Sequence, residues 1–370
     1  MQLVEQHLIR KSDPRYAAID QAAFASKNLY NQATYQIRQA YIHEGTYLPS
    51  AEIFHRVKHL ECYQALPRKV SNSILILIDK NWRSFKAALK AWSEHPEKFT
   101  GRPKLPGYRH KEKGRNILIY DMQALSQKAL KRGIIAPSGL DIEIPTKQTR
   151  QSIDQVRMVP RLDGYMVEVV YRKEEKQALV DPSLLAALDL GVNTLAALTS
   201  TKPGFQPLLV NGRPLKSLNQ HYNKQRAHQQ SHLAKAKRFT SRRLDRITTK
   251  RNRRVTAYLH TASRRIIDHL VREGIGAVVV GKNPFWKQEE SYTSKASFLD
   301  RDPLPTYAPG RKEKPQFRGK REKRGLYRAS DGRRIHADVN GSYNVLRKAF
   351  PNSFGQGIEA PAVVPRRLAV

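Results

Sequence analysis

Apolar residues recur at helical spacing over residues 16–91, which predicts a small bundle of helices. After it the pattern changes to the short apolar or alternating runs that are typical of strands. Four such runs occur, at 117–120, 142–145, 156–159 and 165–171. Leu162-Asp163-Gly164 provides a turn between the last two. A small antiparallel sheet or barrel is therefore expected between residues 116 and 172.

The second half of the chain begins after a polar stretch, residues 174–182, that is expected to be a linker. Residues 184–200 then have the pattern of a strand, a tight turn at Gly191-Val192-Asn193 and a second strand. A long helical region is predicted at 216–272 and a short buried strand at 277–280. They are followed by a poorly packed insert at 303–334, an amphipathic helix at 337–346 and a disordered tail at 351–370.

The charge of the chain indicates a polyanionic partner. Lys and Arg number 67 against 32 Asp and Glu, which gives a formal net charge of +35. A loop held by prolines carries Arg102, Lys104, Tyr108, Arg109 and Lys111, which suit phosphate contacts and base stacking, although a solvated linker is the alternative. In the helical region we expect nucleic-acid contacts, rather than a merely solvated face, from Lys235, Arg238, Arg242, Arg243, Arg246, Arg253 and Arg254.

Several classes of protein are excluded by the same survey. The longest apolar runs are far shorter than the ~20 residues of a membrane-spanning helix, so no membrane partner is expected. The first residues lack the pattern of a secretion signal, which predicts an intracellular protein. Cys62 is the single cysteine, and this excludes an internal disulfide and a zinc site built from cysteines.

Two acid-bearing segments are candidates for holding a metal ion. Leu188-Asp189-Leu190-Gly191 follows an apolar run, and Ala337-Asp338-Val339-Asn340 opens the amphipathic helix. Alone, an Asp next to a Gly is most often a turn residue. Here, however, the order is strand with Asp, turn, strand, basic helical region, strand, and Asp on a helix. That is the order of an RNase H-like domain, in which carboxylates from separate elements hold two metal ions.

Four motifs spread over most of the chain match one known family. They are Arg102-Pro103-Lys104-Leu105-Pro106, Leu188-Asp189-Leu190-Gly191, Tyr292-Thr293-Ser294-Lys295 and Ala337-Asp338-Val339-Asn340-Gly341-Ser342-Tyr343-Asn344. The chain carrying them resembles the TnpB proteins of bacterial insertion sequences, which are relatives of type V CRISPR effector nucleases. The fold class that this implies is α/β plus a β-barrel: a wedge-like barrel (1–15 and 95–175) with a helical recognition insert (16–94), then an RNase H-like (RuvC) nuclease domain (183–350) with a degenerate zinc-ribbon insert (about 291–335).

The resemblance also implies an activity and its partners. It implies an RNA-guided DNA endonuclease of a transposable element, which takes its guide RNA from the end of the element and cuts target DNA beside a short motif. Asp189 and Asp338 would be catalytic and would bind Mg²⁺ or Mn²⁺. The expected location is the prokaryotic cytoplasm, in association with the nucleoid, and a transposase encoded nearby is a further expected partner.

The chain departs from the family pattern at the second RuvC segment and in the zinc ribbon. Gly281 stands where the family has a glutamate, and the strand that follows is shortened. Glu289 or Glu290 would then complete the catalytic metal site, or both are exposed loop residues. The cysteine positions of the ribbon hold Ser297, Asp300, Arg328 and Asp331, so no zinc is expected.

Three functions are therefore weighed. The first is the RNA-guided nuclease. The second is a guided DNA-binding protein whose nuclease is impaired, which Gly281 and the missing segment favour and the two retained Asp residues oppose. The third is an unguided nucleic-acid-binding protein, which fits the charge but gives no reason for the acidic pair.

Overall fold

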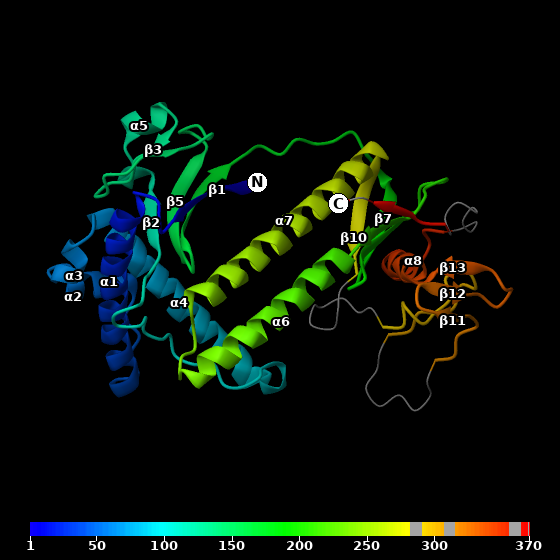
Figure 1. Cartoon of the computed structure of the whole chain (residues 1–370), viewed down its shortest axis with the longest axis horizontal. Coiled ribbons are helices and arrows are strands. Elements are labelled where there is room, and N and C mark those ends of the chain that lie inside the picture. Colours follow the sequence, from blue (N-terminus) through cyan, green and yellow to red (C-terminus); the bar gives the residue numbers. More distant parts are fainter. Residues whose placement is uncertain (282–290, 307–314, 355–363, 369) are drawn as a thin grey trace. The chain divides into compact units, whose positions relative to one another are not determined.

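The computed structural model describes residues 1–281, 291–306, 315–354, 364–368 and 370. The chain divides into two compact units, Met1–Lys176 and Gln177–Val370, each of which is described by itself (Figure 1). Within these described segments, no helix is both long enough and apolar enough to cross a bilayer.

The bundle that the apolar periodicity over 16–91 predicts is formed by α1 (Tyr16–His43), α2 (Ser50–Val57), α3 (Glu61–Gln64) and α4 (Arg68–Glu94). The short helix α5 (Gln127–Lys131) and the 3-10 turns η1 (Pro96–Lys98) and η2 (Met122–Ala124) follow it in the chain. The apolar stripe of α4 supplies Ile74, Ile78 and Trp82, which are at most 2% exposed. Three rings from the bundle surround the Trp82 ring at 5.5–6.0 Å, so this side chain packs in the core rather than stacking on a base.

The first unit also contains a four-stranded antiparallel sheet in the order β1-β6-β5-β2. Its strands are β1 (Gln2–Arg10), β2 (Leu118–Asp121), β5 (Ile153–Arg161) and β6 (Gly164–Arg172). The predicted turn joins β5 to β6, and it needs glycine because a β-carbon on Gly164 would lie 2.0 Å from the carbonyl oxygen of Ile9. The sequence predicts an antiparallel sheet or a barrel, and the structure has the sheet: it is open, with β1 and β2 at its edges, and a closed barrel is not confirmed. Between β2 and β5 the chain forms the separate two-stranded sheet of β3 (Ile134–Ile135) and β4 (Ile144–Pro145).

A partly buried ionic cluster links the bundle to this sheet. Asp20 of α1 accepts hydrogen bonds from both Nε and Nη2 of Arg115, at 3.0 and 2.7 Å, and from the Tyr165 hydroxyl at 2.7 Å. Burial raises the pKa of the Asp20 carboxyl, but the bonds from Arg115 and Tyr165 outweigh it and hold that pKa below its usual value. The cluster fixes the end of α1 against β6.

The second unit has a five-stranded mixed sheet in the order β10-β7-β8-β9-β14. Its strands are β7 (Asp181–Leu190), β8 (Thr194–Ser200), β9 (Leu208–Asn211), β10 (Ile275–Val280) and β14 (Arg366–Leu368), and its helices are α6 (Arg213–Lys235), α7 (Arg242–Arg272) and α8 (Ala337–Ala349). β7 pairs antiparallel with β8 and parallel with β10. The strands at 184–200 and 277–280, the basic helical region and the last helix all occur where the sequence predicts them.

Side-chain alternation along β7 assigns its two faces to different helices. Ala186 and Leu188 pack with Ala262, Ile266 and Leu270 of α7 on one face. Ala187, between them, packs with α8 on the other. Because alternate residues of a strand share a face, Asp189 belongs to the α8 side.

Two segments of the second unit are more ordered than the sequence predicts. Within the expected poorly packed insert, β11 (Lys320–Lys323), β12 (Leu326–Arg328) and β13 (Arg334–His336) form a three-stranded sheet that buries Tyr327 and Ile335. In the expected disordered tail, β14 pairs parallel with β9. Arg366-Arg367-Leu368 looks unsuited to a strand, but an edge position leaves its cationic side chains exposed to water.

Replacing Trp82 by alanine tests the bundle core. The Trp82→Ala variant should lose about 3–5 kcal/mol of unfolding free energy, because a fully buried ring leaves a cavity. Trp92→Ala is the matched control, since Trp92 is only half-buried and contacts Arg102, and it should cost less than about 1 kcal/mol. Denaturant titration followed by far-UV circular dichroism measures both. Equal losses would mean that the bundle is not organised around Trp82.

Candidate functional site

Asp189 lies at the carboxyl end of a central strand. It is the penultimate residue of β7, pairs with Ala197 of β8 and is half-buried. The turn that follows is tight, because a β-carbon on Gly191 would lie 2.7 Å from the carbonyl oxygen of Thr194. The strand and the turn together hold the carboxylate at the end of the sheet, on the side covered by α8.

Asp338 lies in the first turn of α8. The ring of His336 caps this helix by accepting a hydrogen bond from the Asp338 backbone amide at 3.3 Å. A carboxylate in the first turn is stabilised by the partial positive charge of the helix N-terminus. Asp338 is also 3.7 Å from the guanidinium of Arg321 on β11, and a third of its side chain is exposed to solvent.

The structure brings these two acids to the same end of the interface between β7 and α8. A β-carbon on Gly341 would lie 2.7 Å from Oδ2 of Asp189, so α8 and the carboxylate are in direct contact. Ser342 donates to the carbonyl oxygen of Ala187 at 3.0 Å. As the chain advances along β7 from Ala187 to Asp189, the contacts on α8 move back from Ser342 to Gly341. Asp338, one turn earlier on the same side of α8, therefore lies toward the end of β7 that carries Asp189.

Gly281 follows β10 directly beside this pair. Its amide donates to the carbonyl oxygen of Leu188 at 2.8 Å, so it neighbours Asp189 on the adjacent strand. The position at which the family has a glutamate is therefore next to the acids, but it carries no side chain. Glu289 and Glu290, the predicted replacements, lie outside the described residues.

The donor set suits a hard divalent cation. In the part of the chain that the structure describes, no group of three His, Cys, Asp or Glu side chains converges on one point. Mg²⁺ does not need such a group, because it is commonly bound by one or two carboxylates, with water and substrate phosphates as its other ligands. Asp189 and Asp338 provide two carboxylates of this kind. Burial lowers the pKa of His336, although the charge of Asp338 opposes this shift, and the neutral ring is the form that caps α8.

A basic helical hairpin extends from the same unit. α6 and α7 run side by side (Figure 1) and carry fifteen Lys and Arg but only two Asp. Tyr222 and Thr248 are hydrogen-bonded at 3.0 Å, and Arg251 donates to Asn219 at 2.7 Å. No residue of α6 is buried. The predicted contact residues Lys235, Arg238, Arg242, Arg243, Arg246, Arg253 and Arg254 are all exposed on or next to this hairpin.

The predicted basic loop lies in the other unit and is attached to α1. Asn31 both donates to the Arg109 carbonyl oxygen and accepts from the Arg109 amide, at 2.9 and 2.8 Å. The guanidinium of Arg38 lies 5.1 Å from the Tyr108 ring centre, and Tyr108 is 47% exposed. Arg102, Lys104 and Lys111 are also exposed. The loop thus presents its cations to solvent from a backbone that is fixed.

Sequence reasoning missed a second group of cations near the acids. A shallow cavity beside the turn after β7 is lined by Asn193, Arg213, Lys216, Ser217, Gln220 and Arg324. Lys216 donates to the side chain of Asn193 at 3.3 Å. No sequence signal joins Arg324 to residues more than a hundred positions earlier, because the fold alone brings them together.

Gly341→Ala tests the contact between α8 and Asp189. An alanine at a helix interior usually adds about 0.5–1 kcal/mol of stability relative to glycine. Here the added methyl group meets the carboxylate, so the variant should instead lose about 1–3 kcal/mol. In an Asp189→Ala background the overlap is gone, and the same substitution should be stabilising. A double-mutant cycle of unfolding free energies measures this coupling, and additive effects would place Asp189 away from α8.

Comparison with known proteins supports the motif analysis over one part of the chain. Among solved structures, a cryo-EM structure of a Cas12f1–sgRNA–target DNA complex is 12% identical with a TM-score of 0.48, covering 89% of this chain and 82% of that one. A CRISPR–Cas12f ternary complex is 12% identical with a TM-score of 0.26, covering 75% and 65%. Both likenesses are too remote to carry an argument.

Sequence comparison is more specific. No curated protein matches the chain. Residues 168–285 match the model of the OrfB_IS605 family, described as a probable transposase. These residues include β7 with Asp189, the basic hairpin and β10. Over this segment the chain is similar to the OrfB_IS605 (TnpB) family, the family that the sequence motifs resemble.

Proposed function

We propose that the protein is an RNA-guided DNA endonuclease of an insertion sequence, with a metal-dependent site formed by Asp189 and Asp338. The observation that carries the proposal is the contact of α8 with the Asp189 carboxylate, which gathers two acids from distant parts of a strongly cationic chain. A protein that only bound polyanions would gain nothing from placing two carboxylates together, because they repel phosphate.

The arrangement of the second unit supports an RNase H-like (RuvC) domain. β7, β8 and β9 are consecutive antiparallel strands, and β10 returns parallel to β7 after the basic hairpin. Asp189 is on the first strand and Asp338 is on the helix that covers it. The match of residues 168–285 to the OrfB_IS605 family model favours the same assignment.

The chain's own groups would divide the chemistry between them. Asp189 and Asp338 would hold Mg²⁺, with Glu289 or Glu290 as a third carboxylate. When bound, Mg²⁺ supplies an activated water and offsets the charge on the leaving oxygen. Arg213, Lys216 and Arg324 would orient the backbone phosphates beside the acids. The hairpin and the basic loop would hold the guide–target duplex by its backbone, while base pairing reads the sequence.

Gly281 favours a second candidate function. It occupies the strand end beside Asp189 but offers no ligand. If neither glutamate replaces the missing acid, the protein would bind guided target DNA without cutting it. The same purified complex distinguishes the two, since binding and cleavage are measured separately.

Carboxamide variants test the nuclease assignment. The chain is produced together with the DNA of its element's end, and the co-purified RNA is sequenced to identify the guide. With matching target DNA and Mg²⁺, Asp189→Asn and Asp338→Asn should each lower the cleavage rate by at least about 100-fold, because even a 1 Å misplacement at such a site costs about that much. Target affinity should be retained, since a negative charge has been removed.

Asp181→Asn is the matched control, because it makes the same change at the opposite, exposed end of β7. Its cleavage rate should equal that of the unmodified protein. Binding without cleavage by the unmodified complex would establish the second candidate instead. Copurification of RNA without a defined sequence would point to an unguided binding protein.

Salt dependence tests the basic hairpin without requiring a guide. Arg242, Arg243 and Arg246 are exposed at the start of α7. For a short DNA duplex, the slope of log affinity against log salt concentration should become less negative by about 2–3 when all three are replaced by glutamine. Each phosphate contact contributes about 0.9 to the size of that slope. Arg264→Gln, on the same helix but already paired with Asp268, is the control. An unchanged slope in the triple variant would remove the hairpin from the interface.

A further inference from the structure

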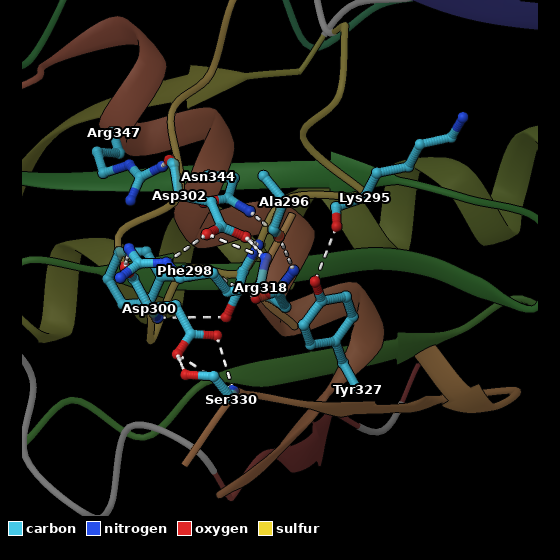
Figure 2. A network of polar contacts seen from close by, with 12 residues as sticks. Lys295, Ala296, Phe298, Asp300, Asp302, Arg318, Tyr327, Ser330, Asn344 and Arg347 are labelled. Carbon is cyan, nitrogen blue, oxygen red and sulfur yellow. Dashed lines mark hydrogen bonds and ion pairs between the residues drawn. The ribbon is translucent and has the colours of Figure 1, made fainter. Parts of the chain in front are cut away.

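A network of polar contacts holds the turn at residues 293–302 (Figure 2). This turn comes before the sheet β11–β13 in the chain. Asp302 is at its centre, with a side chain that is 1% exposed. Its carboxylate accepts from the Ser297 amide at 2.8 Å, from the Arg318 amide at 3.1 Å and from Arg318 Nε at 3.1 Å. A buried carboxylate is tolerated only when it is paired and hydrogen-bonded, and these donors meet that requirement.

A second carboxylate joins this turn to the β-sheet of the insert. Asp300 accepts from the amide of Ser330 at 3.0 Å and also from its hydroxyl group. The Asp300 amide in turn donates to the Ser297 hydroxyl at 3.2 Å. Ser330 belongs to the turn between β12 and β13. Asp300 therefore connects residues 297–302 to a hairpin almost thirty positions later.

The same turn is fixed to α8 by side chains at helical spacing. Asn340 accepts from the Phe298 amide at 2.9 Å and donates to the Ala296 carbonyl oxygen at 2.8 Å. Asn344, one turn later, donates to that oxygen at 2.8 Å, and Arg347 donates to the Asp302 carbonyl oxygen. The ring of Phe298 is stacked on that of Tyr343 at 4.6 Å. Asn340, Asn344 and Arg347 are spaced i, i+4 and i+7, so they lie on one face of the helix. This face is distinct from the Gly341–Ser342 side that meets β7.

The contact with β7 holds one side of α8. Gly341 and Ser342 permit close approach, and Val345 and Leu346 pack with Ala187. α8 has 13 residues, and a helix of that length is marginal without tertiary packing. The attached turn holds α8 from the opposite side, so its position depends on both contacts.

We propose that Asp302, supported by Asp300, is a positioning residue for the metal site. The two carboxylates make the 293–302 turn rigid, and the turn clamps α8 so that Asp338 is held beside Asp189. The catalytic consequence rests on the proposed nuclease function, whereas the mechanical coupling does not.

Asp302→Asn is the sharpest test because it changes the charge and hardly the volume. Both carboxylate oxygens of Asp302 accept from N–H groups, so in either orientation the new amide NH₂ would face a donor. Asp331→Asn is the matched control: Asp331 also accepts from an amide and a guanidinium, both of Arg333, but within one exposed turn. Asp300→Asn is a second test variant, in case Asp302→Asn does not fold.

Amide hydrogen exchange on the full chain measures the mechanical coupling. Asp302→Asn should raise exchange rates at least about tenfold both in 293–302 and in 337–344, because breaking a buried pair is strongly destabilising. Asp300→Asn should raise them in the same two segments, and Asp331→Asn only within 329–333. Unchanged exchange in 337–344 for both test variants would overturn the proposal.

The Mg²⁺ concentration that cleavage requires tests whether Asp302 positions Asp338. If Asp338 is displaced, the Mg²⁺ concentration that gives half-maximal rate should rise by about tenfold in Asp302→Asn, with target affinity unchanged. A slower rate with the same Mg²⁺ requirement would contradict a positioning role. Should the unmodified protein not cleave DNA, the proposed nuclease function fails, and the exchange measurement still decides whether the network clamps α8.

Discussion

The close approach of α8 to β7 is the contact on which the candidate site depends. Gly341 lets the helix lie directly against the Asp189 carboxylate, where any larger residue would meet it. Ser342 reinforces the approach from its neighbouring position, through bonds to Ala187 and Thr199. Small side chains thus bring the backbones together, while a polar network on the far side of the helix limits its movement. The two acids have a defined relationship because both surfaces of α8 are occupied.

The basic hairpin, unlike α8, is not held by close packing. α6 has no buried residue, and the two helices are joined by a few polar contacts such as Tyr222 with Thr248. Its fifteen cations repel one another with little apolar surface to offset them. A phosphate backbone placed along it would relieve that repulsion. The hairpin is therefore a surface whose stability and ligand affinity depend on the same charges, and both respond to salt.

The sequence could predict those elements whose pattern is local. The apolar runs of β7 and β8, the amphipathic spacing of α4 and α8 and the charge of α6 and α7 can all be recognised in short windows of sequence. The sheet of 320–336 and strand β14 were missed, because cationic edge strands lack an apolar pattern and exist through their partners. The sequence left open whether the strands of the first unit form a sheet or a barrel, since strand number does not determine closure. The sequence also singles out Asp189 and Asp338 as candidate ligands, and their roles remain a prediction. It gives no sign of the contacts made by Asp302, Arg321 and Arg324, because contacts between residues in separate elements leave no trace in spacing.

Ser342 and Ala187 are hydrogen-bonded across 155 positions of the chain, and this separation has a consequence for biosynthesis. Contacts so distant in sequence form late, because a long loop must close first. During translation the cationic helices emerge before the last helix exists. The chain therefore acquires its strongly cationic surface well before Asp189 and Asp338 are brought together, and a polyanion bound at that stage meets a protein whose candidate metal site is not yet assembled.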